Sequence, residues 1–172
     1  MCETLRTLVS IAQVGGVLVA ISALWWQIRR ARLATNVELA LRFDDKFNRE
    51  DFRKLRAEAA KELKQGDPSK KAEDVFDLFE TIGYLVRTSA IRREMAWHTF
   101  YEWVHGYWSA GNQQIMKSRH EKKDPKLWSD FEYLHRELLN VQRSESSSGE
   151  PELLSPEEID QFLQDESPRK LG

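Results

Sequence analysis

An uninterrupted apolar segment near the N-terminus constrains this chain more than any other feature. The stretch from Leu8 to Ile28 contains no charged residue, whereas charged residues make up 31% of the whole chain. As an α-helix this stretch would extend roughly 30 Å, which is the thickness of the hydrocarbon core of a bilayer. The segment therefore predicts a transmembrane helix over residues 8–28, within an N-terminal signal anchor of residues 1–32.

The residues that close the apolar segment are typical of a membrane surface. Trp25 and Trp26 stand where amphipathic rings favour the level of the lipid headgroups. Arg29, Arg30 and Arg32 follow them, where guanidinium groups can meet water and lipid phosphates. These five residues form the predicted membrane boundary, and the lipid bilayer is the first predicted partner.

Two other interpretations of the segment are less favoured. A buried core helix would normally carry a polar stripe at helical spacing, which the residues from Leu8 to Leu24 lack. A cleaved signal peptide would use Ala20 and Ser22 as a small-x-small site. Cleavage there would leave several arginines directly behind the site, and such arginines oppose translocation.

The distribution of arginines predicts the orientation of the span. Arg6 is the only arginine before it, whereas Arg29, Arg30 and Arg32 follow it, and positive residues stay on the cytoplasmic side. We therefore expect a single-pass protein of the inner, cytoplasmic membrane, with its N-terminus outside and its C-terminal domain in the cytoplasm. The single cysteine, Cys2, allows no intrachain disulfide and is compatible with a reducing compartment.

Small residues recur along one face of the predicted span. Ala12, Gly16 and Ala20 are spaced four residues apart, so their side would let two helices approach closely. This stripe predicts helix association and a possible homo-oligomer through the span, although small residues are also common in membrane helices that do not associate.

The rest of the chain reads as all-α, because no stretch alternates with a period of two over the length of a strand. Residues 33–143 predict a cytoplasmic bundle of about five helices, the first being a stalk that continues the span. Asn48 is the expected N-cap of the second helix, which should stop at the sequence QGDPSK. The third to fifth helices are expected over Ala72–Ser89, Met95–Lys117 and Leu127–Val141, with the third at the centre.

Residues 144–172 form an acidic tail. The sequence SESSSGEPE predicts a flexible linker, and Ser155 is the expected cap of a short acidic helix with an apolar side. This helix has three possible states: docked on the basic loop or on the apolar stalk, bound to another protein, or disordered until it binds.

Enzyme signatures and phosphate-binding loops are absent from the sequence, so a non-enzymatic role without a cofactor is favoured. One constellation supports a different hypothesis, a helical-bundle enzyme or metal site. Paired ExxH motifs can hold two metal ions in a bundle core, and the chain has two. The candidate ligands are Glu80, Glu102, His105, Glu132 and His135. The ExxH residues lie beside the apolar stripes, however, which favours half-exposed flank residues that form helix-to-helix hydrogen bonds.

Two charged features have plainer interpretations. Glu80 stands among apolar residues, where burial would raise its pKa unless a cation such as Arg87 or Arg92 pairs with it, and such a pairing is the favoured prediction. The basic stretch from Lys117 to Lys126 predicts a solvated loop, or contact with acidic lipids or the acidic tail. No nucleic-acid partner is expected, because charges are nearly balanced over the domain.

Four motifs together carry a resemblance to a known family. They are NVELALRFDDKFN (Asn36–Asn48), DVFDLFETIGYLV (Asp74–Val86), WVHGYW (Trp103–Trp108) and DPKLWSDFEYL (Asp124–Leu134). From about Leu5 to Leu139 the chain resembles a group of small bacterial membrane-anchored helical proteins classed as a domain of unknown function. The resemblance implies a bacterial or phage-related origin and an anchored helical domain, and it supplies no catalytic residues.

Taken together, these features predict a membrane-tethered helical module for interaction or regulation, with an unidentified protein partner. The helical-bundle enzyme or metal protein is the alternative. An oligomeric membrane effector is a weaker one, because the span lacks a polar face.

Overall fold

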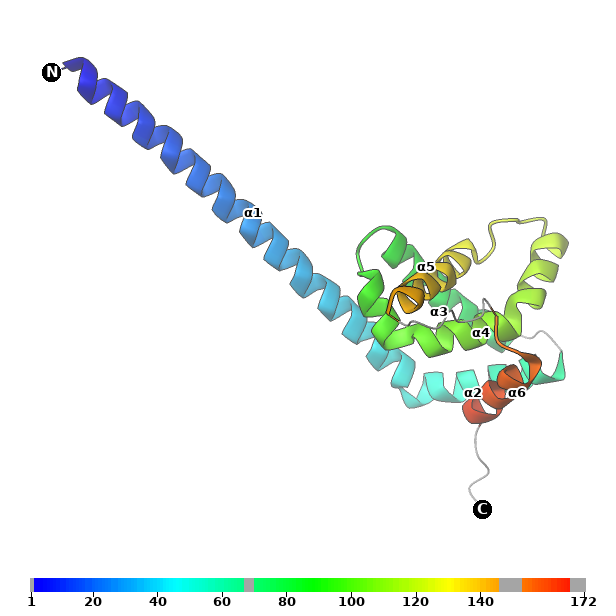
Figure 1. The fold of residues 1–172 in the computed structure, drawn as a ribbon. Helices are drawn as coiled ribbons and strands as arrows, with labels where there is room; N and C mark the ends of the chain where they lie inside the picture. The colour runs from blue at the N-terminus through cyan, green and yellow to red at the C-terminus, as the bar shows by residue number, and fades with distance from the viewer. Residues whose placement is uncertain (1, 67–69, 146–152, 168–172) are drawn as a thin grey trace. The chain divides into compact units, whose positions relative to one another are not determined.

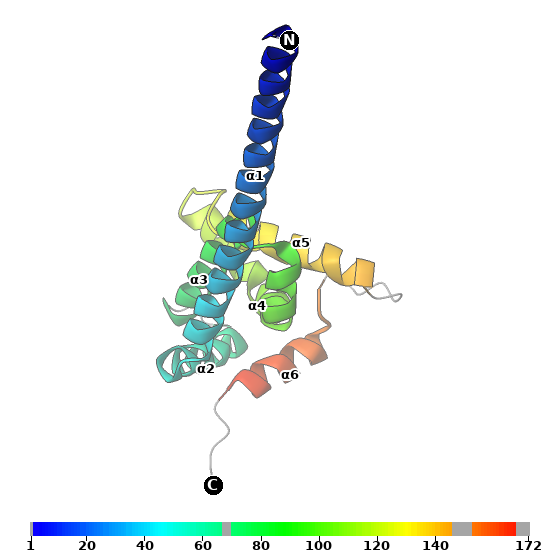
Figure 2. The same ribbon diagram turned by 90° about the vertical axis from the view of Figure 1, so that its left-hand side faces the viewer.

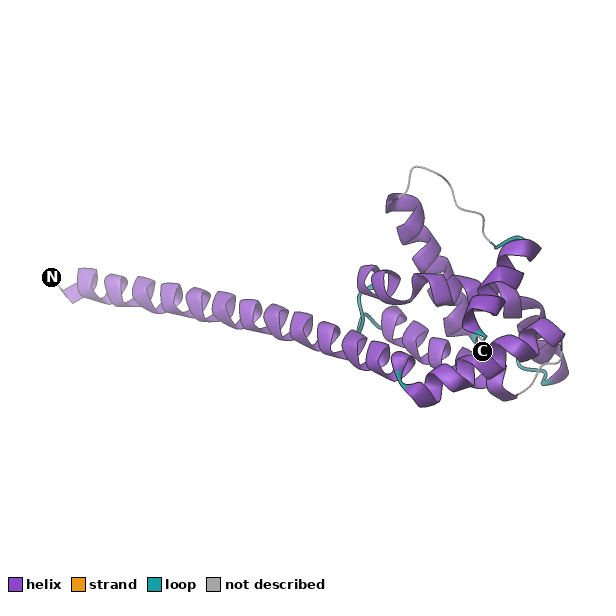
Figure 3. Cartoon of the chain, turned by 90° about the horizontal axis from the view of Figure 1, so that it is seen from below, coloured by secondary structure: helices purple, strands orange, loops and turns teal. Residues whose placement is uncertain are grey.

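The computed structural model describes the backbone of residues 2–66, 70–145 and 153–167, and the side chains of residues 20–30, 36–66, 70–145 and 153–167. Every regular element in these ranges is an α-helix (Figure 3). The helices are α1 (Cys2–Asn48), α2 (Glu50–Gln65), α3 (Lys70–Arg87), α4 (Arg93–Glu121), α5 (Ser129–Glu145) and α6 (Pro156–Glu166), as labelled in Figure 1. The predicted all-α class is therefore confirmed.

The chain divides into two compact units, Met1–Val37 and Glu38–Gly172. The first unit consists of most of α1. The second contains the end of α1 and the helices α2 to α6. The predicted flexible linker at residues 144–152 lies largely outside the described residues.

The junction between α1 and α2 differs in detail from its prediction. Asn48 is the last residue of α1, and its side-chain amide donates to the backbone oxygen of Asp44. The N-cap of α2 is Arg49, which has extended backbone angles and makes no side-chain capping bond. The acidic first turn holds Glu50 and Asp51, as the sequence predicts, because negative charge favours the positive end of a helix.

The core of the second unit is built on aromatic rings. Phe47, at the end of α1, is fully buried and contacts Phe79, Phe100 and Trp103 with ring centroids 4.9 to 5.9 Å apart. Rings at such separations in tilted or edge-to-face arrangements stabilise a core beyond the burial of their area. Phe47 therefore anchors the end of α1 in the second unit.

Helix α3 is the central element, as the sequence predicts. It packs on α2, α4 and α5, most extensively on α5. The close approach of α3 and α5 requires Gly83, because a Cβ added there would lie 2.0 Å from the backbone oxygen of Asp130. A side chain at this position would push the two helices apart.

The C-terminal helix α6 is docked rather than isolated. It packs on α2 and α4 and is drawn orange to red in Figures 1 and 2. Its start confirms the predicted cap at Ser155, which forms a capping box with Glu158: Glu158 donates its backbone N–H to the Ser155 hydroxyl, and the Glu158 carboxylate accepts from the Ser155 backbone N–H. Of the three states predicted for the tail, the structure shows docking on its own chain, but α6 packs on α2 and α4, at Arg56, Trp103 and Tyr107, instead of on the predicted basic loop or stalk.

Candidate functional site

The predicted membrane boundary lies on an exposed stretch of α1. The side chains of Trp25 and Trp26 are 61% and 57% exposed. The Arg29 guanidinium lies over the Trp25 ring, 5.3 Å from its centroid, and Arg30 lies over Trp26 at 5.1 Å. Each pair forms because residues four apart share a helix face. The side chain of Arg32 lies outside the described residues.

The predicted span over residues 8–28 lies mostly outside the described side chains, which begin at Ala20. Over the residues that the structure describes, no helix combines the length and apolar character needed to cross a bilayer. Of the predicted association stripe, Ala12 and Gly16 lie outside the described side chains, and Ala20 is exposed. The helix association stays a prediction.

The two histidines of the ExxH motifs meet between α4 and α5. Nδ1 of His105 and Nε2 of His135 lie 3.0 Å apart, and both side chains are buried. Tyr101 stacks on His105, and Trp108 stacks on His135, each with ring centroids 5.5 Å apart. The prediction that these histidines are half-exposed is wrong, although the predicted bond between helices is present.

The position of α4 explains this error. The helix is in contact with α3, α5 and α6, so it is covered on more than one side. A residue beside the most apolar stripe of α4 therefore packs against another helix instead of facing water. Of the four residues on which the predicted stripe centres, Val104 and Trp108 are buried, whereas Trp97 and Tyr101 are only partly buried. His105, beside the stripe, is buried as well.

The carboxylates of the hypothetical metal site do not join the histidines. Glu102 is exposed, and the Glu132 carboxylate pairs with Arg119, 2.8 Å from its Nη1. Among the residues described, no three His, Cys, Asp or Glu side chains are grouped to hold a metal ion. Of the five candidate ligands, the structure brings together only His105 and His135.

Glu80 has a different role from the predicted ion pair. Its carboxylate accepts a hydrogen bond from the backbone N–H of Phe131, 2.7 Å away, in the first turn of α5. Arg87 pairs instead with Asp130, and Arg92 pairs with Glu94, so neither of these two cations is the predicted partner, although the charge of Arg119 acts on the Glu80 carboxylate in the direction that lowers its pKa. Burial raises the pKa of Glu80, and the N–H of Phe131 partly opposes this rise. Glu80 thus caps α5 from the neighbouring helix α3.

The buried histidine pair predicts a loss of stability in acid. Burial lowers the pKa of His105, and burial together with the charges of His105 and Arg143 lowers the pKa of His135 to about 3. His135 therefore stays neutral in the folded chain down to about pH 3, whereas in the unfolded chain it is protonated below about pH 6.5. The contribution of the neutral, buried His135 to the free energy of unfolding is therefore fully present above pH 6.5. It is lost progressively as the pH falls toward 3. Between pH 7 and pH 5 we expect the protonation of His135 in the unfolded chain to lower the free energy of unfolding by about 2 kcal/mol.

Urea unfolding of the chain in detergent at pH 7 and pH 5 measures this loss. The variant His135→Phe keeps a ring in the stack and removes the titrating group, so its stability should fall less between the same two pH values. Equal losses in the natural chain and in the variant would exclude the histidine pair as the cause.

A second buried polar cluster joins α6 to α2 and α4. The Glu166 carboxylate lies 2.7 Å from Arg56 Nη1, and it accepts hydrogen bonds from Trp103 Nε1 at 3.2 Å and from the Tyr107 hydroxyl at 3.0 Å. The side chains of Arg56 and Glu166 are only 8% and 14% exposed. Burial and the negative charge of Glu166 raise the pKa of Tyr107, which keeps its phenol protonated as a donor.

The Arg56 guanidinium is held in place by aromatic rings. It lies 3.9 Å from the ring centroid of Phe47 and 5.7 Å from that of Trp103. Gly106 lies on α4 next to Tyr107, and a Cβ added there would meet the Phe162 ring at 2.4 Å. We call this surface of α2 and α4 the carboxylate-binding face; it consists of Arg56, Trp103, Gly106 and Tyr107.

The sequence pattern does not predict this cluster. Arg56 and Glu166 are separated by 110 positions, and the pattern of either helix alone gives no reason to pair them. One local signal was present, since Arg56 lies next to the apolar stripe of α2, where a charge needs a partner.

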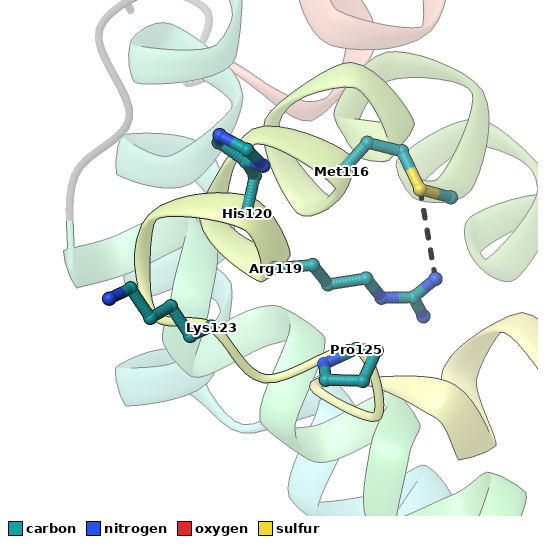
Figure 4. A pocket seen from close by; sticks show the side chains of 5 residues that line it. All are labelled: Met116, Arg119, His120, Lys123 and Pro125. Atoms are coloured by element: carbon teal, nitrogen blue, oxygen red, sulfur yellow. Dashed lines mark hydrogen bonds between the residues drawn. The ribbon is translucent and has the colours of Figure 1, made fainter.

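A surface pocket of about 600 Å³ lies at the end of α4 and in the loop after it (Figure 4). It is lined by Met116, Arg119, His120, Lys123 and Pro125. The Arg119 guanidinium is used structurally, because its Nε donates to the backbone oxygen of Leu127 at 2.8 Å. The predicted basic loop is helical as far as Glu121.

Comparison with known proteins places the chain in a family. The sequence profile of the family described as "Domain of unknown function (DUF4760)" matches residues 10–138. The chain belongs to the DUF4760 family. The predicted resemblance to a domain of unknown function is therefore confirmed. No curated protein and no solved structure matches the chain.

The residues that bind the Glu166 carboxylate and Glu166 itself lie on different sides of the boundary of the DUF4760 match. Arg56, Trp103, Gly106 and Tyr107 lie within the matched residues, whereas α6 and its Glu166 follow them in the sequence. The carboxylate-binding face thus belongs to the DUF4760 domain, and the helix that occupies it lies outside the matched region.

Proposed function

We propose that the chain is a membrane-tethered helical interaction module. In this proposal residues 8–28 cross the inner membrane once, with the N-terminus outside and the DUF4760 domain in the cytoplasm. One observation carries it: from Ile21 to Ile28, α1 exposes five large apolar side chains, with arginines directly after them. They are Ile21, Leu24, Trp25, Trp26 and Ile28.

These exposed apolar side chains are more stable in contact with lipid or with another protein than in contact with water. Exposed apolar side chains that lie side by side are uncommon on proteins dissolved in water and indicate contact with a membrane or another protein. A helix suits the membrane, because all its backbone N–H and C=O groups between the ends are paired within it. Indole rings followed by guanidinium groups suit the change from hydrocarbon to headgroup.

The features of the second unit favour interaction over catalysis. Within the described part of the chain, the two buried polar clusters join helices to one another, and no three His, Cys, Asp or Glu side chains are grouped to hold a metal ion. A domain tethered to a membrane meets other membrane proteins at a raised effective concentration. Self-association through Ala12, Gly16 and Ala20 would add to this effect and remains a prediction.

The orientation of the proposed span is testable with reporters fused after Gly172. Green fluorescent protein should fluoresce there, and alkaline phosphatase should stay inactive, because the C-terminus is predicted to be cytoplasmic. Replacing Arg29, Arg30 and Arg32 by glutamine should lower the fluorescence and raise the phosphatase activity, since these charges hold their side of the helix in the cytoplasm.

A control variant removes the same charge at positions far along the sequence from the span. The changes Lys117→Gln, Lys123→Gln and Lys126→Gln affect exposed residues and should leave both reporters unchanged. An active phosphatase on the natural chain would contradict the proposed orientation. Equal responses of the two triple variants would contradict the role of the arginines.

A further inference from the structure

The contact between α6 and the domain has the form of a ligand in a receptor. We propose that the carboxylate-binding face recognises an acidic amphipathic helix, that α6 is its internal occupant, and that a helix of the same pattern from a partner protein displaces α6. This inference rests on the proposed function, because it names the class of partner that the interaction module binds.

The recognition of the carboxylate is the first step. Three donors from two helices converge on Glu166: Arg56 from α2, and Trp103 and Tyr107 from α4. Hydrogen bonds between ionised groups are stronger than neutral ones, and the rings around Arg56 hold its guanidinium ready for a carboxylate. The site therefore selects a carboxylate over an amide or a hydroxyl group at this position.

The apolar side of α6 sets the spacing of the ligand. Phe162 packs edge-on against Tyr107 with ring centroids 5.2 Å apart, at the place that Gly106 leaves open. Leu163 is buried beside it. Phe162 and Glu166 are four residues apart and so share one helix face. The recognised pattern is an aromatic residue, a leucine, two further residues and a glutamate.

The helix α6 is attached in a way that permits exchange. Leu163 is its only fully buried residue, and its further ion pair, Lys64 with Asp160, is largely exposed and contributes little. A helix of this length is marginal on its own in water, so it folds mainly where it docks. A partner helix needs only the same few contacts to compete with it.

The charge of α6 indicates the chemistry of the partner. The helix contains Glu157, Glu158, Asp160, Asp165 and Glu166 and no basic residue. A partner that replaces it would present a glutamate and an apolar pair on one helix face, with acidic residues around them. This is the helix-in-groove type of peptide recognition with a charged anchor.

A peptide of residues 153–167 tests the proposal on the full chain in detergent micelles. An undocked variant, with Phe162→Ala, Leu163→Ala and Glu166→Gln, removes the contacts of α6 with the carboxylate-binding face and leaves the residues of that face unchanged. Fluorescence anisotropy of the labelled peptide measures binding to the natural chain and to this variant. Circular dichroism shows whether the variant keeps its helices. Insertion into a membrane plays no part in this test, so its result is independent of the tether.

We expect the peptide to bind the undocked variant at least tenfold more tightly than the natural chain, whose face α6 occupies. The peptide change Glu166→Gln should weaken binding about tenfold or more, because it removes a charged hydrogen-bond acceptor. The change Glu157→Gln removes the same charge from an exposed position and should leave binding nearly unchanged. Adding Gly106→Ala to the undocked variant should also weaken binding, because its Cβ occupies the place of Phe162.

Four results would overturn the proposal. The undocked variant could lose its helices, which would make α6 part of the core, or it could fold and fail to bind the peptide. The Glu166→Gln and Glu157→Gln peptides could bind equally, which would exclude recognition of the carboxylate. The natural chain could remain unbound at peptide concentrations a thousandfold above those that saturate the variant, which would exclude displacement of α6.

Discussion

Replacing Gly83 by alanine is expected to lower the free energy of unfolding by about 3 kcal/mol or more. The added Cβ would lie 2.0 Å from the backbone oxygen and 2.5 Å from the backbone carbon of Asp130. No rotation of a side chain relieves a collision with the backbone. Helices α3 and α5 therefore have to move apart along the most extensive helix contact of the described structure.

Gly106→Ala is the matched control for this change. It makes the same substitution inside a helix, but its Cβ meets the Phe162 ring of α6 instead of backbone atoms. Alanine also favours a helix over glycine, by roughly 1 kcal/mol. Urea unfolding in detergent should show a much smaller loss for Gly106→Ala than for Gly83→Ala. Equal losses would contradict the close packing of α3 against α5.

Replacing Val17 by arginine is expected to move the chain from the membrane to the soluble fraction of lysed cells. Val17 lies near the middle of the predicted span, where an arginine costs roughly 2.5–3.5 kcal/mol on insertion scales. A change of this size shifts the equilibrium between inserted and uninserted chain by about a hundredfold.

Val17→Leu is the control, because it changes the same position and keeps its apolar character. This variant should stay in the membrane fraction together with the natural chain. If Val17→Arg stays there as well, hydrocarbon is not the surroundings of this segment. Immunoblots of the two fractions with an antibody against the C-terminal domain make the comparison.

Features that depend on local sequence were predictable. The capping box at Ser155 and the stop of α2 at Gly66 follow from residues a few positions apart, and both are observed. The central position of α3 was also predictable from the sequence, because the stretch from Phe76 to Val86 is apolar on almost all sides of the helix. Its many buried residues agree with that pattern.

Features that depend on which helix faces which were not predictable. The burial of His105 and His135 follows from the several helices packed on α4, and no single-helix pattern contains that information. Glu80 looked like half of an ion pair, yet its partner is a backbone N–H of α5, which the sequence does not distinguish from any other. The pair of Arg56 and Glu166 joins two helices whose paired residues are 110 positions apart in the sequence.

The central claim is that the N-terminal segment of this DUF4760 protein holds its helical domain at a membrane. Membranes from cells that express the natural chain, washed in alkaline carbonate and centrifuged at high speed, test it most directly. The account predicts that the chain stays in the pellet after this wash and is released only by detergent. Recovery of the chain in the supernatant without detergent would contradict the tether.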